Sequence, residues 1–101
     1  NKNQFDIVVA RALAPLPILL ELAIPLLKVH GTFLAMKSAK GREELAQSKN
    51  AIDVLGAKLS SIQEDNLPNE EGLRLNMMFE KTRPTEHKYP RKWADIEKKP
   101  L

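Results

Sequence analysis

Phe5-Asp6-Ile7-Val8-Val9-Ala10 runs directly into Arg11, and Gly31-Thr32-Phe33-Leu34-Ala35-Met36 runs directly into Lys37, with an apolar helical stretch between them. The first segment is a continuous apolar run with one acid, which is typical of a central parallel strand buried on both faces. In an open α/β sheet, ligands bind in the crevice outside the carboxyl ends of the strands. The cations that follow these two strands are therefore predicted to point into a binding site.

The remaining segments are predicted to alternate between helices and strands. A first helix begins near Pro15 and Pro17 and ends at Pro25, because proline lacks the amide donor and clashes with the preceding turn. A turn through 26–28 leads to the strand at 31–37. A second helix runs from Ser38 or Ala39 to Gly56, a typical helix stop. Strands follow over 57–67 and 73–81, around an acidic turn at 68–72. Their inward residues are predicted to be Leu59 and Ile62 in the first, and Leu75, Met77 and Phe79 in the second.

This order of elements predicts an α/β fold that is half of a doubly wound sheet. The last two strands are expected to form an antiparallel hairpin, because five turn residues cannot make a parallel crossover. A nucleotide-binding fold normally carries a glycine-rich loop after its first strand, and this sequence has none. We therefore expect the first half of the sheet upstream of Asn1. Without it, the strand at 5–10 would be an apolar edge that invites self-association.

The composition is that of a globular protein. Apolar residues make up 43% of the 101 residues, and there are no cysteines, which excludes disulfides and thiolate metal sites and fits a reducing cytoplasm. The apolar run over 12–27 is shorter than the ~20 residues that a membrane-spanning helix needs, and it contains Glu21 and three prolines. His30 and His87 lie far apart with no third ligand. Neither a membrane nor a metal is expected as a partner.

Positive charge is concentrated at the carboxyl-terminal end of the chain. Residues 81–101 hold seven Lys or Arg against three acids, whereas residues 40–80 hold five against eight. Such a block is typical of a surface that binds a polyanion, most often a nucleic acid. The alternative is a solvated tail that keeps the protein soluble. We expect 1–81 to form the folded part and 82–101 a basic tail, which Pro90 and Pro100 would keep extended rather than helical.

Four motifs in register resemble one known family. They are the two strand ends quoted above, with Ala12 and Pro15-Leu16 after the first, then Arg74, then Lys88-Tyr89-Pro90-Arg91-Lys92 with Lys99-Pro100-Leu101. The chain is similar to the RsmG (glucose-inhibited division protein B) family over nearly its whole length. The resemblance implies a Rossmann-like class I methyltransferase that uses S-adenosylmethionine to methylate N7 of a guanine in small-subunit (16S) ribosomal RNA. It also implies that this chain is the C-terminal half of such an enzyme and is inactive alone.

The chain departs from the family pattern at two places. His30 takes the first position of a glycine pair that usually precedes the strand at 31–37, which we interpret as a local change in a turn. The tail continues with Trp93-Ala94-Asp95-Ile96-Glu97, where the family usually has a small residue and then Gly-Thr-Pro. Lys98 and Lys99 keep the basic character of this end.

The resemblance assigns Arg11 to the cofactor site. A guanidinium can pair bidentately with a carboxylate such as that of the methionine moiety, or it can hold an RNA phosphate. The alternative is an arginine that closes its strand by pairing with an acid. Asp6 lies in the same strand, and it is expected to be a capping or pairing acid rather than a site residue.

The other candidate site residues are cations expected to bind RNA. Lys37 could bind a phosphate or the guanine O6 acceptor, or it could be an ordinary surface lysine. Arg74 could bind RNA, or it could form a salt bridge with Glu70 or Glu71. The remaining candidates lie in the tail, where aromatic rings could stack on unpaired bases while cations follow the backbone: Lys88, Arg91, Lys92, Lys98 and Lys99, beside Tyr89 and Trp93.

The chemistry implied by the resemblance requires no general acid or base. The N7 atom of guanine has an in-plane lone pair and no proton, so the protein needs only to align the reacting atoms and stabilise charge. Two alternatives stay open: a non-enzymatic RNA-binding or ribosome-associated module that uses the basic tail, and a methyltransferase that acts on a small molecule or a protein.

Overall fold

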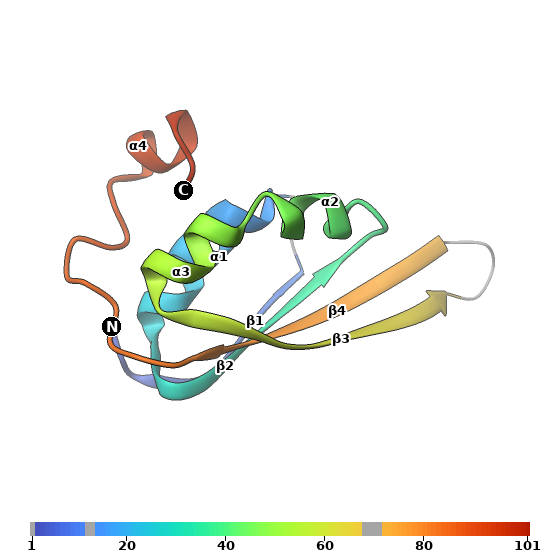
Figure 1. Ribbon diagram of the computed structural model, residues 1–101, viewed down its shortest axis with the longest axis horizontal. Helices are drawn as coiled ribbons and strands as arrows, with labels where there is room; N and C mark the ends of the chain where they lie inside the picture. The colour runs from blue at the N-terminus through green and yellow to red at the C-terminus, as the bar shows by residue number, and fades with distance from the viewer. Residues whose placement is uncertain (1, 12–13, 68–71) are drawn as a thin grey trace.

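The computed structural model describes residues 2–11, 14–67 and 72–101, which form a sheet of four strands with helices on one face (Figure 1). In chain order, the elements are β1 (Phe5–Arg11), α1 (Leu16–Ala23), the 3-10 helix η1 (Ile24–Leu26), β2 (Leu27–Lys37), α2 (Gly41–Ala46), α3 (Lys49–Leu55), β3 (Ala57–Leu67), β4 (Gly72–Lys81) and α4 (Trp93–Lys98). No helix in these described ranges is long and apolar enough to cross a membrane.

The strand order in the sheet is β1-β2-β4-β3. β1 and β2 are parallel, as expected for two strands joined by a helical crossover. β4 lies antiparallel between β2 and β3, and Phe79 is opposite both Phe33 and Leu59. The predicted α/β class and the terminal antiparallel hairpin are both confirmed. The strand order and directions agree with half of a doubly wound, Rossmann-like sheet.

The core lies between the sheet and the helices α1 and α3. Phe33 of β2 and Phe79 of β4 are fully buried, and their rings stack with centroids 6.0 Å apart. Leu75 and Met77, also fully buried, extend this layer along β4, so the inward residues predicted for this strand are confirmed. Leu59 was predicted to be buried but is 36% exposed. A register shift between Leu59 and Ser61 interrupts the alternation of β3 there.

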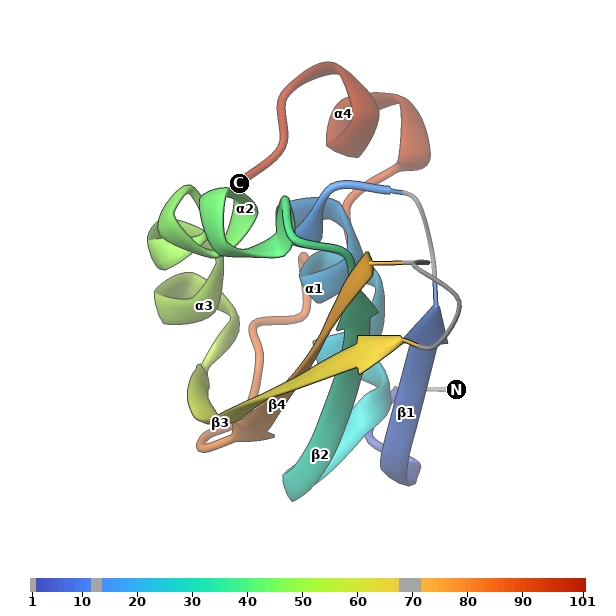
Figure 2. The same cartoon turned by 90° about the vertical axis from the view of Figure 1, so that its right-hand side faces the viewer.

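The opposite face of the sheet is uncovered (Figure 2). Ile7 is 64% exposed, Val9 53% and Met78 40%. β1 is therefore an edge strand with one face exposed, and the prediction of a central strand buried on both faces is wrong for this structure. The reason is that nothing pairs with the outer edge of β1 or covers its outer face in the described part of the chain.

Two predicted boundaries differ from the observed ones. The helix predicted up to Gly56 is split into α2 and α3, because the Ser48 hydroxyl donates to the Glu44 carbonyl oxygen at 2.6 Å and the chain turns there. The stop at Gly56 is confirmed, with a left-handed φ of 81°. β2 begins at Leu27, since Pro25 permits only the single 3-10 turn of η1 before the chain becomes extended.

The carboxyl-terminal tail, residues 82–101, is not extended throughout. It crosses the outer side of the helical layer and forms α4 there, far from the uncovered face of the sheet (Figures 1 and 2). Pro90 and Pro100 flank this helix and do not interrupt it, and Ile96 is 1% exposed. The expectation that the prolines prevent a helix is therefore wrong.

Candidate functional site

The structure brings three of the predicted site residues to one edge of the sheet. β1 ends at Arg11 and β2 ends at Lys37. β4 runs in the opposite direction, so it begins at this edge, and Leu75 pairs with Lys37. Arg74 is therefore next to the ends of the two parallel strands. This edge corresponds to the place where open α/β sheets bind their ligands.

The strand register separates these cations onto two faces. Arg11 pairs with Met36, and Met36 pairs with Asn76. Because neighbouring residues along a strand point to opposite faces, Arg74 shares the uncovered face with Arg11. Lys37 follows Met36 and points to the face that the helices cover. Arg11 and Arg74 thus belong to one surface, and Lys37 does not.

The side chain of Arg11 is exposed, and no ion pair involves it within residues 2–11, 14–67 and 72–101. Among the described residues, its guanidinium is open to solvent. Arg74 is half-buried at the start of β4, and its backbone lies opposite that of Asp65 in the register of the β3–β4 hairpin. The alternative partners of Arg74, Glu70 and Glu71, lie outside the described residues.

Lys37 lies inside the fold rather than on a surface that RNA could reach. Its side chain is 5% exposed. Its Nζ atom donates to the Ala14 carbonyl oxygen at 2.7 Å and lies 2.9 Å from Glu44 Oε1. The same carboxylate oxygen accepts the backbone N–H of Leu16 at 2.9 Å. The expected role of Lys37 in RNA binding has no support in this geometry, and Glu44 is a partner that the sequence analysis missed.

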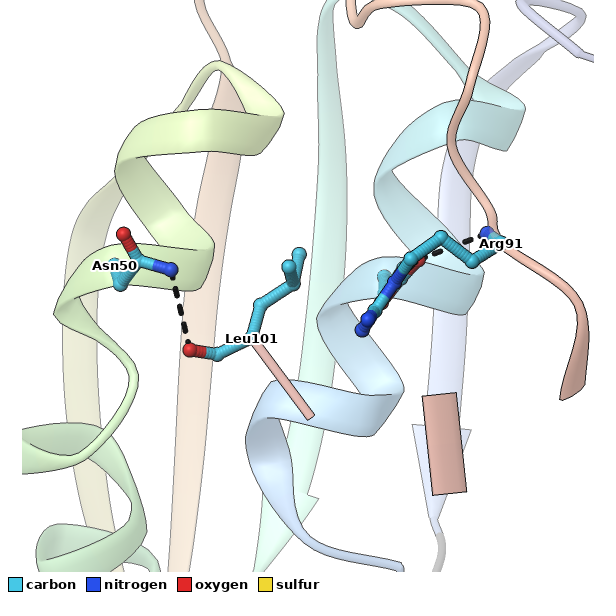
Figure 3. A network of polar contacts seen from close by, with 4 residues as sticks. Asn50, Arg91 and Leu101 are labelled. Atoms are coloured by element: carbon cyan, nitrogen blue, oxygen red, sulfur yellow. Dashed lines mark hydrogen bonds and ion pairs between the residues drawn. The ribbon is translucent and has the colours of Figure 1, made fainter. Parts of the chain in front are cut away.

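Arg91 of the tail is also used inside the protein. Its guanidinium and its backbone N–H all donate to the carboxylate of Glu21 in α1, at 2.7 to 3.2 Å (Figure 3). Glu21 is 0% exposed. Burial alone would raise the pKa of Glu21, but the hydrogen bonds and the charge of Arg91 outweigh burial and lower it. The sequence shows Glu21 only as a charge within an apolar run and does not indicate its partner.

Two further contacts fasten the tail to the body of the protein. Tyr89 is 6% exposed and belongs to the core. The Asn50 side-chain amide donates to the Leu101 carbonyl oxygen at 3.2 Å, which joins α3 to the last residue of the chain (Figure 3). We call these contacts, together with the Arg91–Glu21 pair, the tail clasp. Tyr89 is therefore not free to stack on a base, whereas Trp93 is 52% exposed.

The other tail cations face solvent. Lys88 lies 4.0 Å from Glu86 and 5.3 Å from the Tyr89 ring centroid. A cavity of about 420 Å³ is lined by Arg91, Asp95 and two lysines of α4 and its end. Four exposed lysines thus lie in the tail, in α4 or beside it: Lys88, Lys92, Lys98 and Lys99.

Comparison with known proteins identifies the family. Residues 1–72 match the family described as rRNA small subunit methyltransferase G. The chain belongs to this family. It is 49% identical over 100 residues to the ribosomal RNA small subunit methyltransferase G of Geobacillus sp. (strain WCH70), and 44% identical over 101 residues to the protein of the same name from Staphylococcus carnosus (strain TM300). These matches cover 99% and 100% of this chain, and the chain spans 42% of the length of each relative.

The backbone at His30 agrees with the expected departure from a glycine pair. This residue has a left-handed φ of 74°, a conformation that costs little only for glycine. Glycine is the residue that the family resemblance implies here. A hydrogen bond offsets part of this backbone cost: His30 Nδ1 lies 2.9 Å from Glu80 Oε2, and the contact lowers the pKa of Glu80.

Asp6 lies at the other end of β1 from Arg11. Its Oδ1 atom is 3.8 Å from Lys28 Nζ, so Asp6 is a pairing acid.

Proposed function

We propose that this chain is part of an enzyme that methylates N7 of a guanine in small-subunit ribosomal RNA with S-adenosylmethionine. The observation that carries this proposal is the position of Arg11. Arg11 is exposed at the carboxyl end of a parallel strand, in a chain of the rRNA small subunit methyltransferase G family. Such an enzyme would work in the cytoplasm, where ribosomes are assembled.

Arg11 is the residue of this chain that would hold the cofactor. Its exposed guanidinium fits the carboxylate of the methionine moiety, because two parallel N–H donors match two carboxylate oxygens. When bound, S-adenosylmethionine supplies an electrophilic methyl group. The described residues would contribute charge and alignment at the edge of the sheet, and no proton has to be removed from N7. We therefore assign no general base.

RNA would be held by two separate sets of cations. Arg74 shares the uncovered face of the sheet with Arg11, so it would bind a phosphate close to the reacting base. The exposed lysines of the tail lie on the helical side and would bind the backbone at a distance from the chemistry, by an attraction that weakens with salt. We leave Lys37 and Arg91 out of this surface, because both are paired inside the protein.

The test is a chimera in which this chain replaces the matched 100 residues of the Geobacillus relative. We expect the chimera to form N7-methylguanosine in unmodified small-subunit RNA, as measured by mass spectrometry of nuclease digests. Arg11→Lys should lower the activity roughly tenfold to hundredfold, because a point charge cannot replace a bidentate contact. Arg83→Lys, at an exposed arginine that follows the opposite end of β4, is the matched control. Equal activity in both variants would remove Arg11 from the site.

A non-enzymatic RNA-binding module is the second candidate, and the exposed lysines of the tail favour it. It predicts that the chain alone binds small-subunit RNA with an affinity that does not respond to S-adenosylmethionine. A methyltransferase of a small molecule or protein predicts a different result, namely methyl transfer by the chimera that is indifferent to RNA. The methylation assay, run with and without RNA, and this binding measurement together separate the three functions.

A further inference from the structure

One buried ion pair holds the connection between β1 and α1. Lys37 Nζ binds the carbonyl oxygen of Ala14, and Glu44 Oε1 binds both Lys37 Nζ and the backbone N–H of Leu16. Ala14 precedes α1 by two positions, and Leu16 is its first residue. The pair therefore attaches α2 and the end of β2 to the two backbone groups where the connection enters the helix.

The packing of α2 shows that this contact is built closely. A side chain on Gly41 would meet Lys37 Cβ at 2.8 Å and the methyl group of Met77 at 2.7 Å. Only a glycine therefore lets the start of α2 approach the end of β2 this closely. Glu44 is three residues further along the same short helix, and its side chain is 22% exposed. This approach brings the carboxylate to Lys37.

The Lys37–Glu44 pair is not explained by a contribution to the free energy of unfolding. Burying a lysine and a glutamate costs desolvation that their attraction only partly returns, and apolar residues of similar size are often as stable. The pair does something that apolar residues cannot do: it binds a carbonyl and an amide of a neighbouring connection in one geometry. Arg11 lies three residues before Ala14, at the end of β1. The pairing of β1 with β2 fixes the backbone on the amino-terminal side of Arg11.

We propose that Lys37 and Glu44 are positioning residues for Arg11, and that neither touches the cofactor or the RNA. Together they hold Ala14 and Leu16, the entry to α1 that follows Arg11 along the chain, and so set where the Arg11 guanidinium stands at the edge of the sheet. This inference rests on the proposed function of Arg11. It replaces the direct role in RNA binding that the sequence analysis expected of Lys37.

The test uses the paired variant Lys37→Met/Glu44→Leu, which removes both anchors but leaves no unpaired buried charge. The matched control is Lys40→Met/Glu43→Leu, which makes the same two changes at exposed neighbours. In the 101-residue chain, hydrogen exchange of the Leu16 amide should become roughly tenfold faster in the paired variant, because that amide loses a charged acceptor. It should not change in the control. Unchanged exchange at Leu16 in the paired variant would overturn the anchor.

In the chimera, the paired variant should lower kcat roughly tenfold with little change in the KM for RNA. Introduced together with Arg11→Ala, it should cause no further loss, because it acts only through Arg11. Losses that multiply in the combined variant would show a merely structural role and overturn the inference. A raised KM for RNA with unchanged kcat would also overturn it, because that result would indicate that Lys37 binds RNA directly. Full activity of Arg11→Ala alone would refute the proposed function, whatever the exchange at Leu16.

Discussion

Removing Arg91 should destabilise this protein strongly, although Arg91 looks like an ordinary tail cation in the sequence. Glu21 is 0% exposed, and Arg91 gives it hydrogen bonds from Nε, Nη2 and the backbone N–H. Arg91→Ala leaves a buried carboxylate with only the backbone donor. Breaking a buried ion pair in this way costs about 3 to 5 kcal/mol. The Arg91 side chain is 25% exposed, so water can partly replace it, and we expect about 3 kcal/mol.

The assay is thermal unfolding of the 101-residue chain, followed by circular dichroism. A loss of about 3 kcal/mol should lower Tm by roughly 12 to 24 °C in a domain of this size. Lys92→Ala, the adjacent and exposed cation, is the matched control and should change Tm little. Trp93 is the one tryptophan in the sequence, so its fluorescence reports whether the tail detaches before the sheet unfolds.

A double variant without either charge gives a second test of the Arg91–Glu21 pair. Glu21→Leu combined with Arg91→Met removes both charges and should recover most of the lost stability. Because the pKa of Glu21 is lowered in the folded protein, its contribution is complete above the ordinary value of 4.5 and is lost as the pH falls through and below it. The apolar double variant should lack this part of the acid destabilisation. A Tm for Arg91→Ala equal to that of Lys92→Ala would refute the tail clasp.

Three further predictions concern other surfaces. The chain should self-associate through the apolar edge of β1, and Ile7→Lys should reduce this in sedimentation experiments; a strictly monomeric wild type at high concentration would contradict it. His30→Gly should raise the free energy of unfolding by ~0.5 to 1 kcal/mol, because relief of the left-handed backbone outweighs an exposed pair with Glu80; denaturant titration would instead show a loss if that pair dominates. Replacing four tail lysines by glutamine should flatten the slope of log RNA affinity against log salt by about 3, at ~0.7 per phosphate. The four are Lys88, Lys92, Lys98 and Lys99. An unchanged slope would show that RNA binds to another surface.

Features that depend on neighbouring residues could be predicted from the sequence. The alternation of Leu75, Met77 and Phe79 identified a strand with one buried face, and Gly56 identified the end of a helix. The short turn required a hairpin. Each of these signals comes from a period of two residues, from the backbone freedom of glycine or from the reach of a few residues of chain. The position of Arg11 at a strand end followed in the same way.

Tertiary structure alone decided what the other cations do. Arg91 meets Glu21 across 70 positions of sequence, and nothing local to either residue indicates the other. Lys37 and Arg11 end neighbouring strands, but a difference of one position in register sends them to opposite faces of the sheet. The six residues of α4 are too few to be stable as a helix by themselves, and they form one where Ile96 is buried. Distant packing determines these contacts, so the local pattern that revealed the strands could not reveal which charges the fold would bury.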